Sequence, residues 1–395
     1  MQPNPLLGVV FHWLGGLASG SFYVPYKGVR KWSWETFWLA GGMFSWLICP
    51  WIGALLLTKD LFAVLHEIPS HVFWMTYLMG LLWGFGGLTF GLTMRYLGMS
   101  LGMAVALGFC AAFGTLVPPI VQGEFAQKLL QTHGGNVCFL GVIVCLVGIV
   151  IGGFAGVRKE KDMGNDGKSS AIAEFSLMKG LAIATFSGIM SSCFSYGFQF
   201  GDPITKISAA HGTGPYWVGL PVILVILLGG LTTNFLWCVL LHIKNGSAHQ
   251  YFSPTVKPVA SQTAGGDGHG GKTSVQSFEI GSLVPLMGNW LFCALAGTFW
   301  YFQFFFYQMG ESQMGNYKFS SWTLHMASII IFSTLWGIYL KEWKGAKPAT
   351  RSLVTVMLLF LIGSTVIIGW GNKISSDDDA AKAAAAAITT QAQSK

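Results

Sequence analysis

Charged residues are scarce in this chain. Asp, Glu, Lys and Arg make up only 10% of its 395 residues, while hydrophobic residues make up 52%. Soluble globular proteins carry about 25% charged residues, which keep their surfaces in water. The shortage excludes an ordinary soluble domain. It also argues against a nucleic-acid-binding protein, although the formal net charge is +7.

Cysteines are present, but not in the patterns that bind metals or form disulfide frameworks. All seven fall inside apolar stretches, none belongs to a CxxC pair, and none lies in a polar loop. Structural zinc sites and disulfide scaffolds depend on such spacings. We therefore expect no metal site, and we expect the cysteines to be small buried apolar side chains.

The signatures of common enzyme classes are missing as well. The apolar stretches contain no GxSxG, HExxH or Walker pattern. None of the 16 acidic residues lies in the middle of such a stretch, where one charge would cost about 2.5–3.5 kcal/mol. Glu35, Glu124, Glu311 and Glu342 lie near the ends. Without a buried carboxylate pair for acid–base chemistry, we expect neither an enzyme nor a cofactor.

Long apolar stretches dominate what is present. A bilayer-spanning helix needs about 20 mostly apolar residues, and ten stretches qualify. Only "MQPN" precedes the first, so we expect a retained helix rather than a cleaved signal peptide. The sequence thus predicts an all-α polytopic membrane protein with ten spans at 5–26, 34–57, 72–94, 99–122, 136–156, 178–200, 215–242, 281–309, 320–340 and 352–371.

The positive charges are distributed unevenly between the two sides of this membrane. Of the 23 Lys and Arg residues, sixteen follow odd-numbered stretches, four follow even-numbered ones and three lie in the C-terminal tail. Lys and Arg concentrate on the cytoplasmic side. With ten spans, both termini are therefore predicted to lie outside.

The chain also divides into two similar halves. We expect a first five-helix repeat (1–157), a charged cytoplasmic hinge (158–177), a second five-helix repeat (178–372) and a low-complexity tail (373–395), with a flexible cytoplasmic loop at 244–280. "LGGLASGSF" aligns with "FSGIMSSCF", matching Gly16 with Gly188 and Ser19 with Ser191. Five helices per half would invert the second repeat, an architecture of transporters whose site lies between the halves.

The stretch "GTFWYFQFFFYQMGES" is rich in aromatic rings but contains glutamines. Trp300, Gln303, Phe304 and Tyr307 follow the i, i+3, i+4, i+7 spacing and share one helix face. Rings and an amide suit a neutral, hydroxyl-rich ligand, because the amide both donates and accepts hydrogen bonds. The alternative is a polar contact between helices, which contributes about 0.6 kcal/mol.

Three other predicted helices carry similar polar and aromatic faces. Ser192, Tyr196 and Gln199 share one face of the sixth stretch, Trp322 lies in the ninth and Trp13 in the first. The predicted substrate-binding residues are therefore Trp13, Gln199, Trp300, Gln303, Tyr307 and Trp322.

Two histidines lie well inside apolar stretches, His12 in the first and His325 in the ninth. A histidine's ordinary pKa of about 6.5 suits reversible protonation near neutral pH. Both are candidates for proton coupling, with a neutral hydrogen-bonding role as the alternative. Glu35 is a third candidate, although its position in the first turn of a helix also suits the helix dipole.

Several blocks of sequence resemble the L-rhamnose–proton symporter family of the drug/metabolite transporter superfamily. They include "FYVPYKGVRKWSWET", "GLTMRYLGMSLG", "GTLVPPI", "WYFQFFFYQMG", "SSWTLHM" and "LKEW", and the resemblance covers about residues 5–371. It implies two inverted five-helix halves, external termini, and uptake of a deoxy sugar together with a proton. It does not identify sugar-binding residues one by one.

We therefore predict a secondary sugar transporter that works by alternating access, with a small sugar, a proton and the lipid bilayer as its partners. No obligate protein partner is evident from the sequence. One alternative is a transporter of another neutral metabolite. A second, from a different class, is a sugar-sensing receptor, although the Gly-rich 244–280 loop offers nothing that could fold into an output module.

Overall fold

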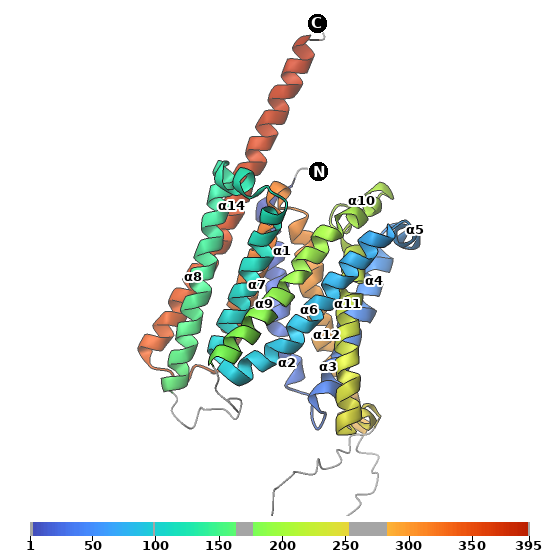
Figure 1. The fold of residues 1–395 in the computed structure, drawn as a ribbon, viewed down its shortest axis with the longest axis vertical. Coiled ribbons are helices and arrows are strands. Elements are labelled where there is room, and N and C mark those ends of the chain that lie inside the picture. The colour runs from blue at the N-terminus through green and yellow to red at the C-terminus, as the bar shows by residue number, and fades with distance from the viewer. Residues whose placement is uncertain (1–2, 98, 163–176, 253–282, 394–395) are drawn as a thin grey trace, which may run out of the picture.

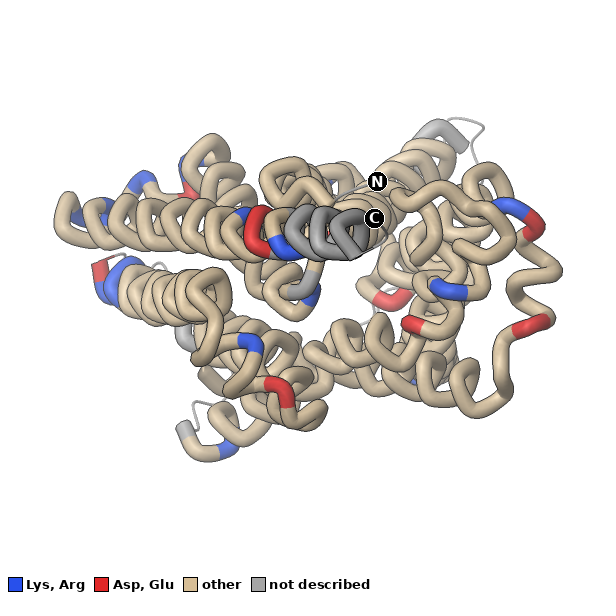
Figure 2. The backbone as a smooth tube through the Cα atoms, turned by 90° about the horizontal axis from the view of Figure 1, so that it is seen from above, with Lys and Arg blue, Asp and Glu red and all other residues tan. Residues whose placement is uncertain are grey.

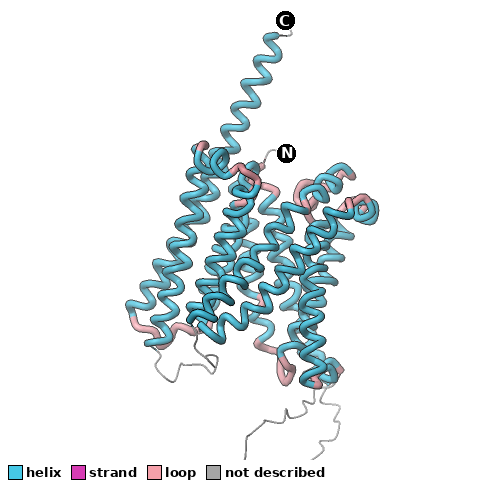
Figure 3. The backbone as a smooth tube through the Cα atoms, viewed as in Figure 1, coloured by secondary structure: helices cyan, strands magenta, loops and turns pink. Residues whose placement is uncertain are grey.

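A computed structural model describes residues 3–97, 99–162, 177–252 and 283–393. These residues form helices joined by short connections, with no strand among them (Figures 1 and 3). The prediction of an all-α polytopic membrane protein is confirmed. The unbroken long helices are α1 (Pro5–Ser21), α6 (Ser70–Leu97), α7 (Met99–Val121), α8 (His133–Asp162), α9 (Leu177–Phe200), α11 (Leu220–Asn245), α12 (Leu283–Glu311), α13 (Ser320–Tyr339) and α14 (Pro348–Gln393).

Within the described residues, nine helical segments are long and apolar enough to cross a membrane. Helix α12 is not among the nine, although its 29 residues would extend about 44 Å at 1.5 Å per residue. Its asparagine, two glutamines and several glycines dilute its apolar character. Length and composition thus support nine of the ten predicted spans directly. Helix α12 is long enough to span a membrane, and its polar side chains suggest a function inside the bundle.

The second apolar stretch is not one regular helix. It consists of α3 (Trp34–Gly42), a π-helical turn η1 (Met43–Ile48) and α4 (Cys49–Leu57). Pro50 near the start of α4 lacks an amide hydrogen, and its ring collides with the carbonyl four residues earlier. The widened π-turn immediately before Pro50 accommodates both effects.

Both ends of the described chain lie at the same end of the helical bundle (Figure 1). Helix α14 continues to Gln393, so the predicted low-complexity tail is helical there. Short elements that the hydropathy pattern did not predict also lie at this end (Figure 1), α5 (Leu61–His66) and α10 (Asp202–Ala210). Most of the predicted hinge and the 244–280 loop beyond 252 lie outside the described residues.

The helices pair in a pattern that repeats between the two halves. Helix α1 packs against α12 and α13, and α9 packs in the same way against α6 and α7, while α8 pairs with α14. The first helix of each half therefore packs on the third and fourth spans of the other half. This divides the central helices into two groups, α1–α12–α13 and α6–α7–α9.

The glycines that matched in sequence occupy corresponding places in this pattern. A methyl group on Gly16 of α1 would collide with the Cβ of Ser328 on α13. A methyl group on Gly188 of α9 would lie 2.6 Å from the carbonyl oxygen of Ala106 on α7. Small residues allow helix backbones to approach closely in lipid, so both positions hold the first helix of a half against its neighbour.

Charged residues are few and scattered in the end-on view of Figure 2. One of them joins the neighbouring ends of α8 and α14, where the Asp162 carboxylate accepts hydrogen bonds from the Thr350 hydroxyl (2.6 Å) and the Lys347 amide (3.0 Å). These hydrogen bonds lower the pKa of Asp162 below its ordinary value. They favour the ionised carboxylate and fix the end of α8 to the start of α14.

Candidate functional site

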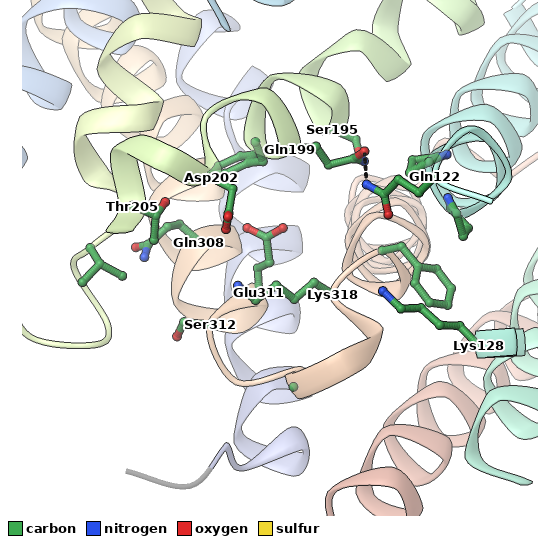
Figure 4. A pocket seen from close by; sticks show the side chains of 17 residues that line it. Gln122, Lys128, Ser195, Gln199, Asp202, Thr205, Gln308, Glu311, Ser312 and Lys318 are labelled. Carbon is green, nitrogen blue, oxygen red and sulfur yellow. Dashed lines mark hydrogen bonds between the residues drawn. The ribbon is translucent and has the colours of Figure 1, made fainter. Parts of the chain in front are cut away.

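A cavity of about 430 Å³ opens at the end of the bundle where the termini lie. Clefts that bind small molecules typically measure about 300–1,000 Å³. Its walls come from α7 and α9 on one side and α12 on the other, so it lies between the two helix groups. Its polar lining, shown in Figure 4, consists of Gln122, Lys128, Ser195, Gln199, Asp202, Thr205, Gln308, Glu311, Ser312 and Lys318.

Amide side chains face this cavity from both groups. Nε2 of Gln122, directly after the end of α7, donates a hydrogen bond of 3.4 Å to Gln199 Oε1 on α9. Across the cavity, Gln308 on α12 is only 3% exposed, yet its Oε1 has no hydrogen-bond partner. A buried carbonyl oxygen without a partner is costly, so this amide is ready to accept a hydrogen bond from a ligand.

Aromatic rings close the cavity toward the membrane interior. Phe198 lines it, and the Phe198 and Tyr307 ring centroids are 5.1 Å apart. Deeper, Phe194 of α9 stacks on Phe304 of α12 at 4.2 Å, and Trp83 of α6 meets Phe304 edge to face at 5.5 Å. We call these five rings the aromatic floor. It joins the two helix groups at the middle of the bundle.

At the other end of the bundle, in the part of the chain that the structure describes, aromatic rings fill the space between α1, α3 and α12. Phe22 packs against Trp300 at 4.2 Å, and Trp38 contacts Trp300 at 6.3 Å. The gap that these rings line has a volume of only about 10 Å³, which is near the minimum for one water molecule. The central path is therefore accessible from one end and closed at the other.

Comparison with known proteins gives a consistent result over almost the whole chain. The family model of L-rhamnose-proton symport proteins matches residues 1–263 and 274–374. L-rhamnose-proton symporters of Yersinia pestis (strain Pestoides F) and Yersinia pseudotuberculosis serotype O:1b (strain IP 31758) are 36% identical over 369 residues, covering 93% of this chain and 98% of theirs. That of Cronobacter sakazakii (strain ATCC BAA-894) is 36% identical over 368 residues, covering 92% and 97%.

The chain belongs to the L-rhamnose–proton symporter family. The resemblance seen in the sequence blocks is confirmed, and with it the prediction of a transporter rather than an enzyme. A symporter must expose its substrate site to one side of the membrane at a time. A cavity open at one end and closed by rings at the other fits one state of such a cycle.

The structure distributes the predicted substrate-binding residues of this symporter over different depths. Gln199 lines the cavity. Tyr307 belongs to the aromatic floor, while Gln303 is buried and its Nε2 lacks a partner. Trp322 is buried too, and its Nε1 donates to the Cys110 carbonyl at 3.0 Å.

The remaining two predicted residues lie farther from the cavity. Trp300 contributes to the closed end, as described above. Trp13 is turned toward α13 and α14: its Nε1 donates to Thr365 Oγ1 at 3.3 Å, and its ring meets Phe332 edge to face at 6.0 Å. Neither lines the cavity.

The two predicted histidines of the symporter meet in the core. Their ring centroids lie 6.4 Å apart, and Tyr307 contacts both, at 5.3 Å from His12 and 5.2 Å from His325. The side chains are 0% and 1% exposed, and none of the four ring nitrogens has a hydrogen-bond partner. The sequence placed them on separate helices, and only packing of α1 against α13 brings them together.

Glu35 is far from the cavity and well bonded. Its Oε1 accepts hydrogen bonds from Ser247 Oγ (2.6 Å) and Asn245 Nδ2 (2.9 Å). His242 Nδ1 in turn lies 2.8 Å from Ser247 Oγ. The carboxylate thus connects the start of α3 to the end of α11, and these hydrogen bonds give it a structural role there.

Of the polar residues that line the cavity, sequence reasoning predicted only Gln199, and Gln308 and Glu311 are among those that it missed. Both belong to the stretch that drew attention to Gln303, but they point in other directions around the helix. Glu311 follows Gln308 by three residues and Tyr307 by four, so the three share a face. That spacing was the available signal, and it was passed over because a carboxylate at a helix end is common.

Proposed function

We propose that this protein takes up L-rhamnose together with a proton across the cell inner membrane, by alternating access. The observation that carries the proposal is the single-ended cavity between the two helix groups, found in a chain whose relatives are named L-rhamnose-proton symporters. An exchange of open and closed ends would move the sugar from one side to the other. Nothing in this mechanism needs ATP.

The proposed topology has ten spans, with α12 as the span that the hydropathy measure leaves out and both termini outside. Two observations support it. The two halves repeat the same helix pairing, as inverted five-helix repeats would. The excess of Lys and Arg after odd-numbered spans indicates that the cytoplasmic end of the bundle is the one opposite the two termini and the cavity. The cavity is then outward-facing.

In this state the sugar would enter between α9 and α12. Gln199 and Gln308 would bind its hydroxyl groups, since an amide can satisfy a hydroxyl as donor and acceptor. The Phe198 ring offers an apolar surface for the sugar's C–H groups and its methyl group. The sugar would reach the deeper predicted residues, Gln303, Tyr307 and Trp322, only when the rings of the aromatic floor move apart. It would reach Trp300 only when the inner end of the path opens.

For the proton, the sequence pointed to His325, His12 and Glu35. The two imidazoles stay a prediction, supported by their four unpartnered nitrogens in the core. None of the three residues lines the outward cavity from which a proton would enter. Glu35 is the weakest of them, because two hydrogen bonds already hold its carboxylate.

Cysteine labelling tests the proposed site and its orientation together. Ser312→Cys, in the cavity wall, should react with a membrane-impermeant maleimide added outside intact cells, and L-rhamnose should slow the reaction. Ser352→Cys, exposed near the start of α14, is the matched control and should react only after the membrane is permeabilised. External labelling of Ser352→Cys but not of Ser312→Cys would reverse the proposed topology.

A further inference from the structure

Glu311 is the carboxylate of the cavity that has no counter-ion in direct contact. Among the described residues, Asp202 pairs with Lys206 (2.7 Å), and Lys128 pairs with Glu124. Glu311 lies half-buried in the cavity wall at the end of α12, and no described cation lies within ion-pair distance of it. An unpaired carboxylate in partly buried surroundings binds a proton more readily than one in water.

The groups around Glu311 come from several elements. Asp202 at the start of α10 points toward Glu311 across the cavity in Figure 4, and its negative charge opposes a second one nearby. Lys318, from the connection before α13, is the cation that acts on Glu311 electrostatically without contacting it. Below, Tyr307 lies one turn away on α12, and the His12 imidazole of α1 packs against Gly310.

A second observation places ligand-binding capacity in the same wall. Gln308, one turn before Glu311, lines the cavity and is almost fully buried, and its Oε1 has no hydrogen-bond partner. A ligand that donates a hydrogen bond to Gln308 would occupy the same cavity as Glu311. Proton and sugar sites would then be adjacent on one helix.

We propose that Glu311 is the group that takes up the transported proton from the outward cavity, next to the sugar held at Gln308. This inference rests on the proposed function and adds the identity of the proton site. The ionised carboxylate accepts one proton from cavity water and becomes neutral. After the cavity opens inward, it releases that proton to cytoplasmic water and regains its negative charge.

Charge burial links the proton to the conformational change. Closing the outer end around an unpaired carboxylate would bury a bare charge, which is strongly unfavourable. The protonated acid is neutral and can donate a hydrogen bond to the sugar, so the loaded carrier closes. The empty carrier has to return with Glu311 ionised, and Lys318 is placed to pair with it during that step.

The test separates sugar exchange from proton-driven accumulation in proteoliposomes. Glu311→Gln should retain exchange of labelled L-rhamnose against unlabelled L-rhamnose, which needs no net proton movement. It should lose accumulation driven by an inward pH gradient, a reduction of at least tenfold. Glu67→Gln is the matched control, an exposed acid near the same end that bonds to His211, and it should resemble wild type.

The outcomes distinguish this inference from the proposed function. If wild type does not exchange L-rhamnose at all, the proposed substrate is wrong. If wild type exchanges and Glu311→Gln still accumulates sugar with the pH gradient, Glu311 is not the proton site. Loss of both activities in Glu311→Gln, with a normal size-exclusion profile and with Glu311→Asp equally inactive, would also overturn the inference, since the residue would then serve sugar binding.

Discussion

Replacing Gln308 with alanine should weaken binding of L-rhamnose without unfolding the protein. The Gln308 amide faces the cavity, and its Oε1 has no partner to lose within the protein. Its side chain packs closely against Gly219, the residue before α11, because a methyl group on Gly219 would collide with the Gln308 Cγ. A prealigned amide loses little conformational freedom when the sugar binds.

The size of the effect follows from the hydrogen bond that the sugar would lose. One neutral hydrogen bond contributes about 0.5–1.5 kcal/mol net. Since about 1.4 kcal/mol corresponds to a factor of ten, the dissociation constant should rise about 2- to 12-fold. Isothermal titration calorimetry on the purified protein measures this change directly. Gly219→Ala should produce a similar loss, because its methyl group has to displace the Gln308 side chain.

Gln313 provides the matched control for this measurement. It is buried near the same end of α12, but its Oε1 accepts from the Asn4 amide at 3.1 Å and its Nε2 donates to Ser312 Oγ at 3.2 Å. Gln313→Ala should therefore lower the melting temperature and leave the affinity near the wild-type value. Equal affinities of wild type, Gln308→Ala and Gly219→Ala would refute the placement of the sugar at this wall.

Three further predictions concern packing, pH and the core histidines. Gly16→Val should lower the free energy of unfolding by about 1–3 kcal/mol, because the valine side chain would collide with Ser328 on α13. Thermal melting in detergent measures this change, and an unchanged melting temperature would mean that α1 is not tightly packed against α13. The lowered pKa of Asp162 means that its hydrogen bond from Thr350 stabilises the fold at neutral pH and is lost as the pH falls below the ordinary aspartate range. Melting curves of Asp162→Asn should therefore show a weaker dependence on acid pH than wild type. His325→Gln should keep its response to a pH gradient in uptake assays, and retained sugar exchange without that response would move the proton site to the core histidines.

The helices were predictable because their cause is local. In lipid, the backbone N–H and C=O groups of each apolar stretch must form hydrogen bonds within the protein. A helix forms them within the stretch itself, whatever its neighbours are. The same logic explains what was missed at the ends. The short helices α5 and α10 depend on contacts with the rest of the bundle rather than on hydropathy. The π-helical turn before Pro50 is caused by that single proline, which a hydropathy pattern does not detect.

The site was less predictable because it depends on which helix faces meet. Gln303 and Gln308 are five residues apart, which turns them about 140° from each other around the helix. The sequence could not tell which of the two faces a cavity, and helix packing places Gln308 there. Glu311 was assigned to an ordinary helix end, because the cavity that reaches it exists only after α9, α10 and α12 come together.

Accumulation of labelled L-rhamnose in proteoliposomes tests the central claim most directly. With one proton per sugar, an inward gradient of one pH unit is worth about 1.4 kcal/mol, which corresponds to about tenfold accumulation at equilibrium. The account predicts this value, its collapse when a protonophore is added, and competition by unlabelled L-rhamnose. L-Rhamnose that equilibrates to equal concentrations on both sides, whatever the pH gradient, would contradict proton-coupled uptake by this protein.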